Sequence, residues 1–159
     1  MTLRPFRPDE ADLLLRNAGP GMTKERMARR IEESGTFVDG MFNLGIEADG
    51  RLVGDVQARS QGVPPGIAEL GITLFASGDR GRGLGREAVA LLTGHLFDAL
   101  LIERVQGSTD VENAAMRRVF ELLGFHEEGV MRGFMPAAHG RRADYVLYAV
   151  LRDEWRGLV

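Results

Sequence analysis

The stretch "DRGRGLGREAVALLTGHLF", residues 79–97, places three glycines at alternate positions and then continues as an apolar run with helical spacing. The unpaired N–H groups and the positive dipole end at the start of a helix bind phosphate, and glycine lets the phosphate approach the backbone closely. The residues that form this loop are Arg80, Gly81, Arg82, Gly83, Leu84, Gly85 and Arg86. The stretch predicts a phosphate-binding loop, with a flexible surface loop before a capped helix as the alternative.

Two other phosphate-binding motifs do not fit this stretch. Gly78 and Gly83 have the spacing of a Walker loop, but the next residues are Leu84 and Gly85, so the required Lys and Ser or Thr are missing. The glycines also spell G-x-G-x-x-A with Ala88. In a dinucleotide-binding fold the first glycine directly follows a strand, whereas here a loop separates it from the expected strand, and the chain is too short for a second mononucleotide-binding half.

The flanking segments predict a parallel crossover around this loop. "AELGITLF", residues 68–75, and "ERVQGSTDV", residues 103–111, are typical of strands. Between them, apolar residues recur at helical spacing and predict a helix with one buried face. These residues are Leu84, Ala88, Leu91, Leu92, Leu96 and Leu100. A strand, a helix and a second strand in this order favour two parallel neighbouring strands in one sheet.

The remaining segments complete an α+β domain over residues 1–159. Asp49-Gly50 and Arg51 lie between two strand-like runs, residues 42–48 and 52–58, and predict an antiparallel hairpin. The other expected elements are strands at 2–6, 127–135 and 144–151 and helices at 8–17, 24–34 and 112–124. We therefore expect one mixed sheet, mostly antiparallel, in a single domain.

Composition excludes several classes of protein. A chain of 159 residues with 44% hydrophobic residues is long enough for one core. The net charge is −3, and Lys24 is the one lysine among 20 basic residues, so no nucleic-acid partner is expected. There is no cysteine, which excludes disulfides and thiolate chemistry. The first residues lack a secretory apolar segment, and no run approaches the ~20 apolar residues of a membrane span, so we expect a cytoplasmic protein without a membrane partner.

The chain resembles the GNAT N-acetyltransferases in five segments. "RGRGLG", residues 80–85, matches the R/Q-x-x-G-x-G/A signature of their acetyl-CoA loop. "LRPFRPDEADLL" (3–14) and "AELGITL" (68–74) resemble the family's opening and fourth strand, and "VENAAMRRVFELLGF" (111–125) resembles its N-x-x-S-x-R-x-x-x-x-x-G-F helix. "DYVLYAVLRDEW" (144–155) is similar to the RimJ/RimL branch of ribosomal-protein alanine N-acetyltransferases. The resemblance implies the family fold, with about seven strands and four helices and two central strands that splay apart.

The resemblance also implies acetyl-CoA as cosubstrate. Its pyrophosphate would lie on the loop from Arg80 to Arg86, and its pantetheine would lie along Ile72, Thr73 and Leu74 like an additional strand. A bulge that freed the N–H groups of Thr73 and Leu74 would let them bind the thioester carbonyl. The resemblance assigns Asn113 and Arg118 to the cofactor as well, although capping of the next helix already explains Asn113.

Glu69 is the candidate general base, because it precedes Arg80 by eleven residues, the spacing of a catalytic carboxylate in several family members. A solvent-facing strand position is the alternative. The candidate general acid is missing: Phe120 stands where many relatives have tyrosine, and Met116 stands where the branch often has serine. Tyr145, Tyr148 or a water would then protonate the leaving thiolate, or the thiolate would leave unassisted.

His139 is an alternative base in the loop between the last two strands, and no histidine pair has metal-ligand spacing, so no metal is expected. The resulting hypothesis is an acetyl-CoA-dependent N-acetyltransferase that acts on a primary amine, either a protein N-terminus or a small molecule. The alternative is a catalytically weak acyl-CoA-binding or regulatory module. The sequence does not identify the acceptor, and the resemblance allows a homodimer.

Overall fold

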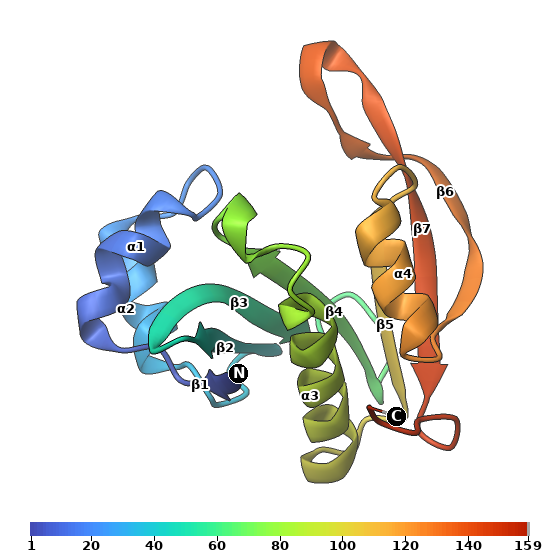
Figure 1. Cartoon of the computed structure of the whole chain (residues 1–159), viewed down its shortest axis with the longest axis horizontal. Coiled ribbons are helices and arrows are strands. Elements are labelled where there is room, and N and C mark those ends of the chain that lie inside the picture. Colours follow the sequence, from blue (N-terminus) through green and yellow to red (C-terminus); the bar gives the residue numbers. More distant parts are fainter. Residues whose placement is uncertain (159) are drawn as a thin grey trace.

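The computed structural model describes residues 1–158, and within them a seven-stranded mixed sheet runs in the order β1-β2-β3-β4-β5-β7-β6 (Figure 1). The strands are β1 (Thr2–Arg4), β2 (Met41–Ala48), β3 (Arg51–Arg59), β4 (Ile67–Leu74), β5 (Arg104–Asp110), β6 (His126–Pro136) and β7 (Arg142–Leu151). Neighbouring strands are antiparallel except β4 and β5. The expected mixed, mostly antiparallel sheet is confirmed.

Four α-helices flank the sheet over the described residues: α1 (Ala11–Arg16), α2 (Lys24–Glu32), α3 (Leu84–Ala99) and α4 (Ala114–Leu122). The helices α1 and α2 pack on each other beside β2 and β3, whereas α3 covers the middle of the sheet and α4 lies by β5 and β7 (Figure 1). Three short 3-10 turns, at Pro8–Glu10, Ser77–Asp79 and Ala138–Gly140, complete the elements. The first expected helix, at 8–17, is therefore one such turn followed by α1.

The predicted hairpin of β2 and β3 is present, and its turn has two residues, because Arg51, expected between the strands, is the first residue of β3. Asp49 and Gly50 have φ angles of 53° and 74°, and positive φ at both central residues matches the turn to the right-handed twist of the strands. Asparagine, aspartate and glycine adopt this conformation more readily than other residues. The turn sets the first two pairs, Ala48 with Arg51 and Glu47 with Leu52, and the register then shifts by one residue between Glu47 and Ile46.

The predicted parallel crossover is present, but β4 and β5 pair over three positions only. The pairs are Ile67 with Arg104, Ala68 with Val105 and Glu69 with Gln106. Beyond Glu69, β4 stays paired with β3 as far as Leu74, and beyond Gln106, β5 stays paired with β7 as far as Asp110. The two strands therefore separate along their second halves, which confirms the expected splay (Figure 1).

The helix α3 is buried over a wider surface than its sequence period predicts. Leu91, which was expected on the buried face, is 41% exposed, whereas Val89, Thr93 and Phe97 are buried. The physical reason is that α3 contacts β4, β3, β1 and α4, so its sides are covered as well as the stripe toward the sheet. The prediction for Leu91 was wrong.

The C-terminal segment fixes the far end of this helix. The Arg152 guanidinium donates hydrogen bonds to the backbone oxygens of Phe97, Leu100 and Ile102. These carbonyls lie at and just beyond the end of α3, where a helix leaves acceptors without partners. Trp155 packs against Phe97 with ring centroids 6.3 Å apart. Arg152 and Trp155, both in the family-like segment 144–155, therefore stabilise the end of α3.

Candidate functional site

The separated halves of β4 and β5 enclose a cavity of about 260 Å³, which we call the β4–β5 groove. It is lined by Leu70, Gly71, Ile72, Ser108, Thr109, Asn113, Met116, Phe120 and Tyr145. Residues from β4, β5, α4 and β7 thus meet there although they are far apart in sequence. Ile72 and Asn113, two of the expected cofactor contacts, lie in this cavity, and Leu84 is buried in the core behind it.

The edge of β4 offers backbone donors to the β4–β5 groove without a bulge. The Phe75 N–H donates to the Val53 oxygen of β3, and the β3–β4 register shows no shift up to Leu74. Successive residues of a strand direct their N–H groups to opposite sides. The N–H of Thr73 therefore points to β3, while those of Ile72 and Leu74 point to the open side. The structure has no bulge here, so strand alternation leaves the Leu74 N–H on the open side while the Thr73 N–H stays directed to β3.

Glu69 lies at the point where the two strands separate, and it does not line the β4–β5 groove itself. Its Oε1 is 2.5 Å from Arg59 Nη2, and its Oε2 accepts a hydrogen bond of 3.0 Å from Gln106 Nε2. The side chain is 23% exposed. Glu69 is thus neither an unpaired base nor simply solvent-facing: two donors hold its carboxylate at the last pair of the parallel ladder, one residue before Leu70, the first residue that lines the groove.

The orientation of Gln106 is fixed from behind. Arg104 Nε donates to Gln106 Oε1 at 3.0 Å, so the amide NH₂ group is directed to Glu69. Arg104 also makes two 2.8 Å hydrogen bonds to Glu128 of β6, which hold the pKa of Glu128 below its ordinary value. Sequence reasoning missed this chain of contacts, and the polar positions of "RVQGSTD" gave no sign of their partners across the sheet.

The glycine-rich loop leads directly into α3, as the sequence predicted. Gly83 is the N-cap residue with φ 80°, and Gly81 has φ 73°, a conformation that side chains other than glycine adopt with strain. The first-turn N–H groups of a helix have no partner within the helix. Gly85 lies inside the helix, where an added Cβ would meet only Ile72 Cδ1 at 3.8 Å. The loop therefore presents free amides.

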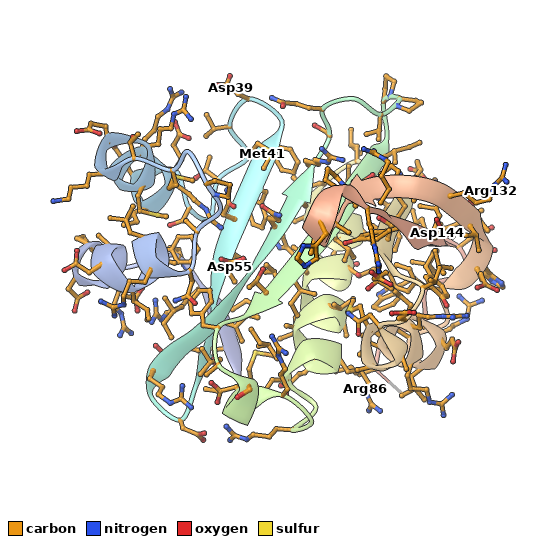
Figure 2. The ribbon with its side chains drawn as sticks, turned by 90° about the horizontal axis from the view of Figure 1, so that it is seen from above. Asp39, Met41, Asp55, Arg86, Arg132 and Asp144 are labelled. Atoms are coloured by element: carbon orange, nitrogen blue, oxygen red, sulfur yellow. The ribbon has the colours of Figure 1, made fainter. Side chains whose placement is uncertain are left out.

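The arginines of the loop differ from one another. Arg82 pairs with Asp49 at 2.6 Å and with Asp79 at 3.2 Å, so it is held at the loop by two carboxylates. Hydrogen bonds from Arg51, followed by the contribution of Arg82, lower the pKa of the buried Asp79 carboxyl. Within residues 1–158, Arg80 and Arg86 have no ion-pair partner, and Arg86 projects from the start of α3 (Figure 2). Two guanidinium groups thus remain available at the loop.

The helix α4 contributes three side chains to the β4–β5 groove. Asn113 caps it, because its Oδ1 accepts a hydrogen bond from the Met116 N–H at 3.1 Å, and it also lines the groove. Met116 and Phe120 line the same cavity, and neither carries a proton donor. Arg118 lies outside the groove, 66% exposed and 3.6 Å from Glu121. The structure brings Asn113 into the site and leaves Arg118 at the surface.

The structure separates the two tyrosines that were candidates for the general acid. Tyr145 lines the β4–β5 groove, whereas Tyr148 is 1% exposed and its hydroxyl accepts a hydrogen bond from Arg117 at 3.2 Å. The third candidate group, His139, is exposed on the β6–β7 loop with φ 58° and lines neither cavity described in this subsection. Of these three side chains, Tyr145 alone lines the β4–β5 groove.

A second cavity of about 450 Å³, the α2 cavity, lies on the other side of β4. Its floor is Met41, Asn43, Asp55, Gln57 and Thr73, and its roof is Asn17, Ala18, Gly19, Met22, Arg26, Arg29, Arg30 and Glu33. The two cavities share a wall, because the Gln57 side chain lies against Gly71: an added Cβ there would be 2.9 Å from Gln57 Nε2. A molecule in the α2 cavity is therefore next to the β4–β5 groove.

Asp55 is the most buried charged group of the α2 cavity (Figure 2). It is 3.2 Å from Arg30 Nη2, and burial raises its pKa while Arg30 opposes the rise. Sequence reasoning missed this pair. An aspartate within the apolar strand "LVGDVQA" was the available signal, because buried charges are rare unless they are paired.

Two features are absent from the described residues 1–158. No group of three or more His, Cys, Asp or Glu side chains has an arrangement that could hold a metal ion. No helix in that range combines the length and the apolar character needed to cross a membrane.

Comparison with known proteins identifies the family. A family profile described as acetyltransferase (GNAT) domain matches residues 1–126. YdaF of Bacillus subtilis (strain 168), named among the ribosomal N-acetyltransferases, is 33% identical over 117 residues, 71% of this chain and 63% of YdaF. The N-acetyltransferase p20 of Bacillus licheniformis is 30% identical over 92 residues, 58% of this chain and 51% of p20. The matches thus span about half to two thirds of these relatives.

A solved structure shows the same fold. Mycobacterium smegmatis RimJ, crystallised with CoA-disulfide, aligns with a TM-score of 0.78 and 23% identity over 96% of this chain and 82% of RimJ. Its identity is low enough that the likeness concerns the fold alone. The profile match covers most of the sequence and includes the glycine loop, both strands of the groove and α4. The chain belongs to the GNAT acetyltransferase family.

Proposed function

We propose that the chain is an acetyl-CoA-dependent N-acetyltransferase, in which a primary amine attacks the thioester carbonyl directly. The observation that carries the proposal is the separation of β4 from β5 beyond Glu69 and Gln106. It leaves the N–H groups of Ile72 and Leu74 unpaired at the edge of a cavity. An extended ligand with amide groups can bind such an edge as an added strand.

The described residues fit acetyl-CoA at its phosphate end as well. Gly81 and Gly83 keep the loop free of side chains, and the first turn of α3 presents N–H groups to an anion. Arg80 and Arg86 are free to add charge-assisted hydrogen bonds. When bound, acetyl-CoA supplies the activated carbonyl. The chain's own part is to hold it, orient it and direct the Ile72 or Leu74 N–H to the carbonyl oxygen.

Proton transfer falls to residues on both sides of the β4–β5 groove. Glu69 takes the proton of the attacking amine, directly or through one water, because its carboxylate is held at the closed end of the groove. Gln106 and Arg59 keep that carboxylate in place. Tyr145 lies along the same cavity and is the candidate to give a proton to the leaving thiolate.

A catalytically weak acyl-CoA-binding or regulatory module is the second candidate. One observation favours it: Met116 and Phe120, which line the groove from α4, cannot donate a proton. Such a module would bind acetyl-CoA through the same loop and strand edge without turnover. The two candidates therefore differ in thiol release and not in ligand binding.

The deciding experiment measures acetyl-CoA binding by calorimetry and free thiol release with a panel of small amines and short peptides. The proposal expects binding and also thiol release that depends on the amine. Binding without release across the panel would favour the module. No binding of acetyl-CoA would contradict both candidates. Separate arms for peptides and for small amines distinguish the two kinds of acceptor.

A further inference from the structure

The α2 cavity holds an uneven set of charges that bears on the choice of acceptor. Three arginines of α2, namely Arg26, Arg29 and Arg30, line it together with Glu33 and Asp55. The cavity adjoins the β4–β5 groove through Gln57 and Gly71. An acceptor that lies in it can thus extend its amine toward the groove. The inference rests on the proposed function, because it concerns the acceptor of that reaction.

Two of the three arginines are already neutralised. Arg29 Nε is 2.7 Å from Glu33, and Arg29 Nη2 is 3.4 Å from Asp39. Arg30 is 3.2 Å from Asp55, donates to Asn43 Oδ1 at 3.2 Å and lies over the Phe6 ring at 5.3 Å. Arg29 is thus shared between two carboxylates, and Arg30 is paired with one. Each of these two guanidinium groups therefore has a carboxylate partner before an acceptor binds.

Arg26 is the exception. Its Nη1 donates to the Gly21 backbone oxygen at 3.2 Å, and among residues 1–158 no carboxylate pairs with it. A guanidinium has five N–H donors in a planar fork that matches a carboxylate. A ligand that covers Arg26 removes water from it, so the ligand must provide the missing acceptor.

We propose that the α2 cavity selects a small amine that carries one carboxylate, which binds Arg26 while the amine extends past Gln57 and Gly71 into the β4–β5 groove. The volume of about 450 Å³ suits a small molecule. A polyamine is disfavoured at this site, because its second ammonium would face Arg26 while Glu33, Asp39 and Asp55 are occupied by arginines. The single unneutralised guanidinium corresponds to a single anionic group.

The test uses three acceptors that share a five-carbon chain and a terminal amine but differ in the charge of the other end: 5-aminopentanoate, pentylamine and 1,5-diaminopentane. Shorter and longer members of each series cover other spacings. Binding in the presence of CoA is measured by calorimetry, and kcat/KM with acetyl-CoA is measured by thiol release. We expect at least one amino carboxylate to bind about tenfold or more tightly than the monoamine and the diamine of the same length. This is the gain expected for a hydrogen bond between charged groups.

Arg26→Gln removes the charge and keeps a hydrogen-bonding side chain of similar reach. We expect it to abolish the preference for the carboxylate in binding and to leave pentylamine unchanged. Lys24→Gln is the matched control, because it removes one positive charge from the same helix outside the cavity. Equal binding of the three acceptors, a preference for 1,5-diaminopentane, or equal effects of the two substitutions would overturn the inference. Absence of thiol release with intact carboxylate binding would instead contradict the proposed function.

Discussion

Glu69 and Gln106 are the last pair of the parallel ladder between β4 and β5, and their side chains are joined by a 3.0 Å hydrogen bond. The pair therefore marks the end of strand pairing, and it places Glu69 one residue before Leu70, where the lining of the β4–β5 groove begins. The strands therefore begin to separate at the residue that carries the proposed general base, and the first prediction tests that residue.

Glu69→Gln should lower the turnover rate about 100-fold or more at neutral pH, because the amide keeps the size of the side chain but cannot accept a proton. Acetyl-CoA affinity should be unchanged, and part of the activity should return at high pH, where the acceptor amine is already neutral. Arg59→Gln is the control, since it breaks the same ion pair but leaves the carboxylate. Equal losses in both variants would assign Glu69 a structural role. Rates from thiol release and affinities from calorimetry check this.

Gly85→Ala should stabilise α3 by up to about 1 kcal/mol while it weakens acetyl-CoA binding by about tenfold. The added Cβ has room within the protein, with Ile72 Cδ1 at 3.8 Å, but occupies the face on which phosphate would lie. Gly94→Ala in the same helix should stabilise α3 by a similar amount without lowering the affinity for acetyl-CoA. Thermal unfolding measures the stability of the two variants, and calorimetry measures their affinity for acetyl-CoA. Unchanged affinity in Gly85→Ala, or in the larger Gly85→Val, would refute the assignment of the glycine loop as the phosphate site. Gly83 is unsuitable, because its φ of 80° makes any side chain strained.

Asn113→Asp should leave stability within about 0.5 kcal/mol, because aspartate caps a helix as well as asparagine does. The affinity for acetyl-CoA should fall, since the new negative charge lines the groove. Asn113→Ala, by contrast, should lower the free energy of unfolding by about 1 kcal/mol. A loss of melting temperature in Asn113→Asp with full affinity would leave capping as the sole role of this residue.

Tyr145→Phe should lower kcat by about tenfold or more if its hydroxyl protonates the thiolate. Its stability should change little, because the hydroxyl makes no hydrogen bond within residues 1–158. Tyr148→Phe is the counterpart: it loses the hydrogen bond from Arg117 and should lose about 1 kcal/mol of stability with little effect on kcat. Full activity in Tyr145→Phe would leave water, or unassisted departure of the thiolate, as the route.

The anchor of the glycine loop should depend on pH. Arg51 and Arg82 lower the pKa of Asp79 below its ordinary value of 3.8, so the ionised form is favoured by folding. The stabilisation is present above the ordinary value and is lost as the pH falls through the lower folded value. The difference in melting temperature between wild type and Asp79→Asn should thus be constant near neutral pH and shrink below about pH 4. Asp153→Asn is the control at an exposed position, and its difference in melting temperature from wild type should not shrink at low pH.

The sequence by itself determined the features that depend on neighbouring residues. The glycine-rich pattern predicted a loop at the start of a helix, where Gly81 and Gly83 adopt positive φ angles, and Asp49-Gly50 makes the turn that sets the first two pairs of β2 with β3. Asn113 caps α4 through a contact three residues away. Such features follow from the chain's own stereochemistry, which is why the parallel crossover, the hairpin and the glycine loop could be predicted together with the family resemblance.

Only the tertiary structure decided which side chains from distant segments meet. The positions of Arg59 and Gln106 around Glu69, the pairing of Arg82 with Asp49, and the Arg30–Asp55 pair all join residues ten or more positions apart. The direction of the Ile72 and Leu74 N–H groups likewise depends on the register with β3. Sequence periodicity gives the face of a strand but not its partner across the sheet. The physical reason is that contacts between strands are set by the packing of the whole domain.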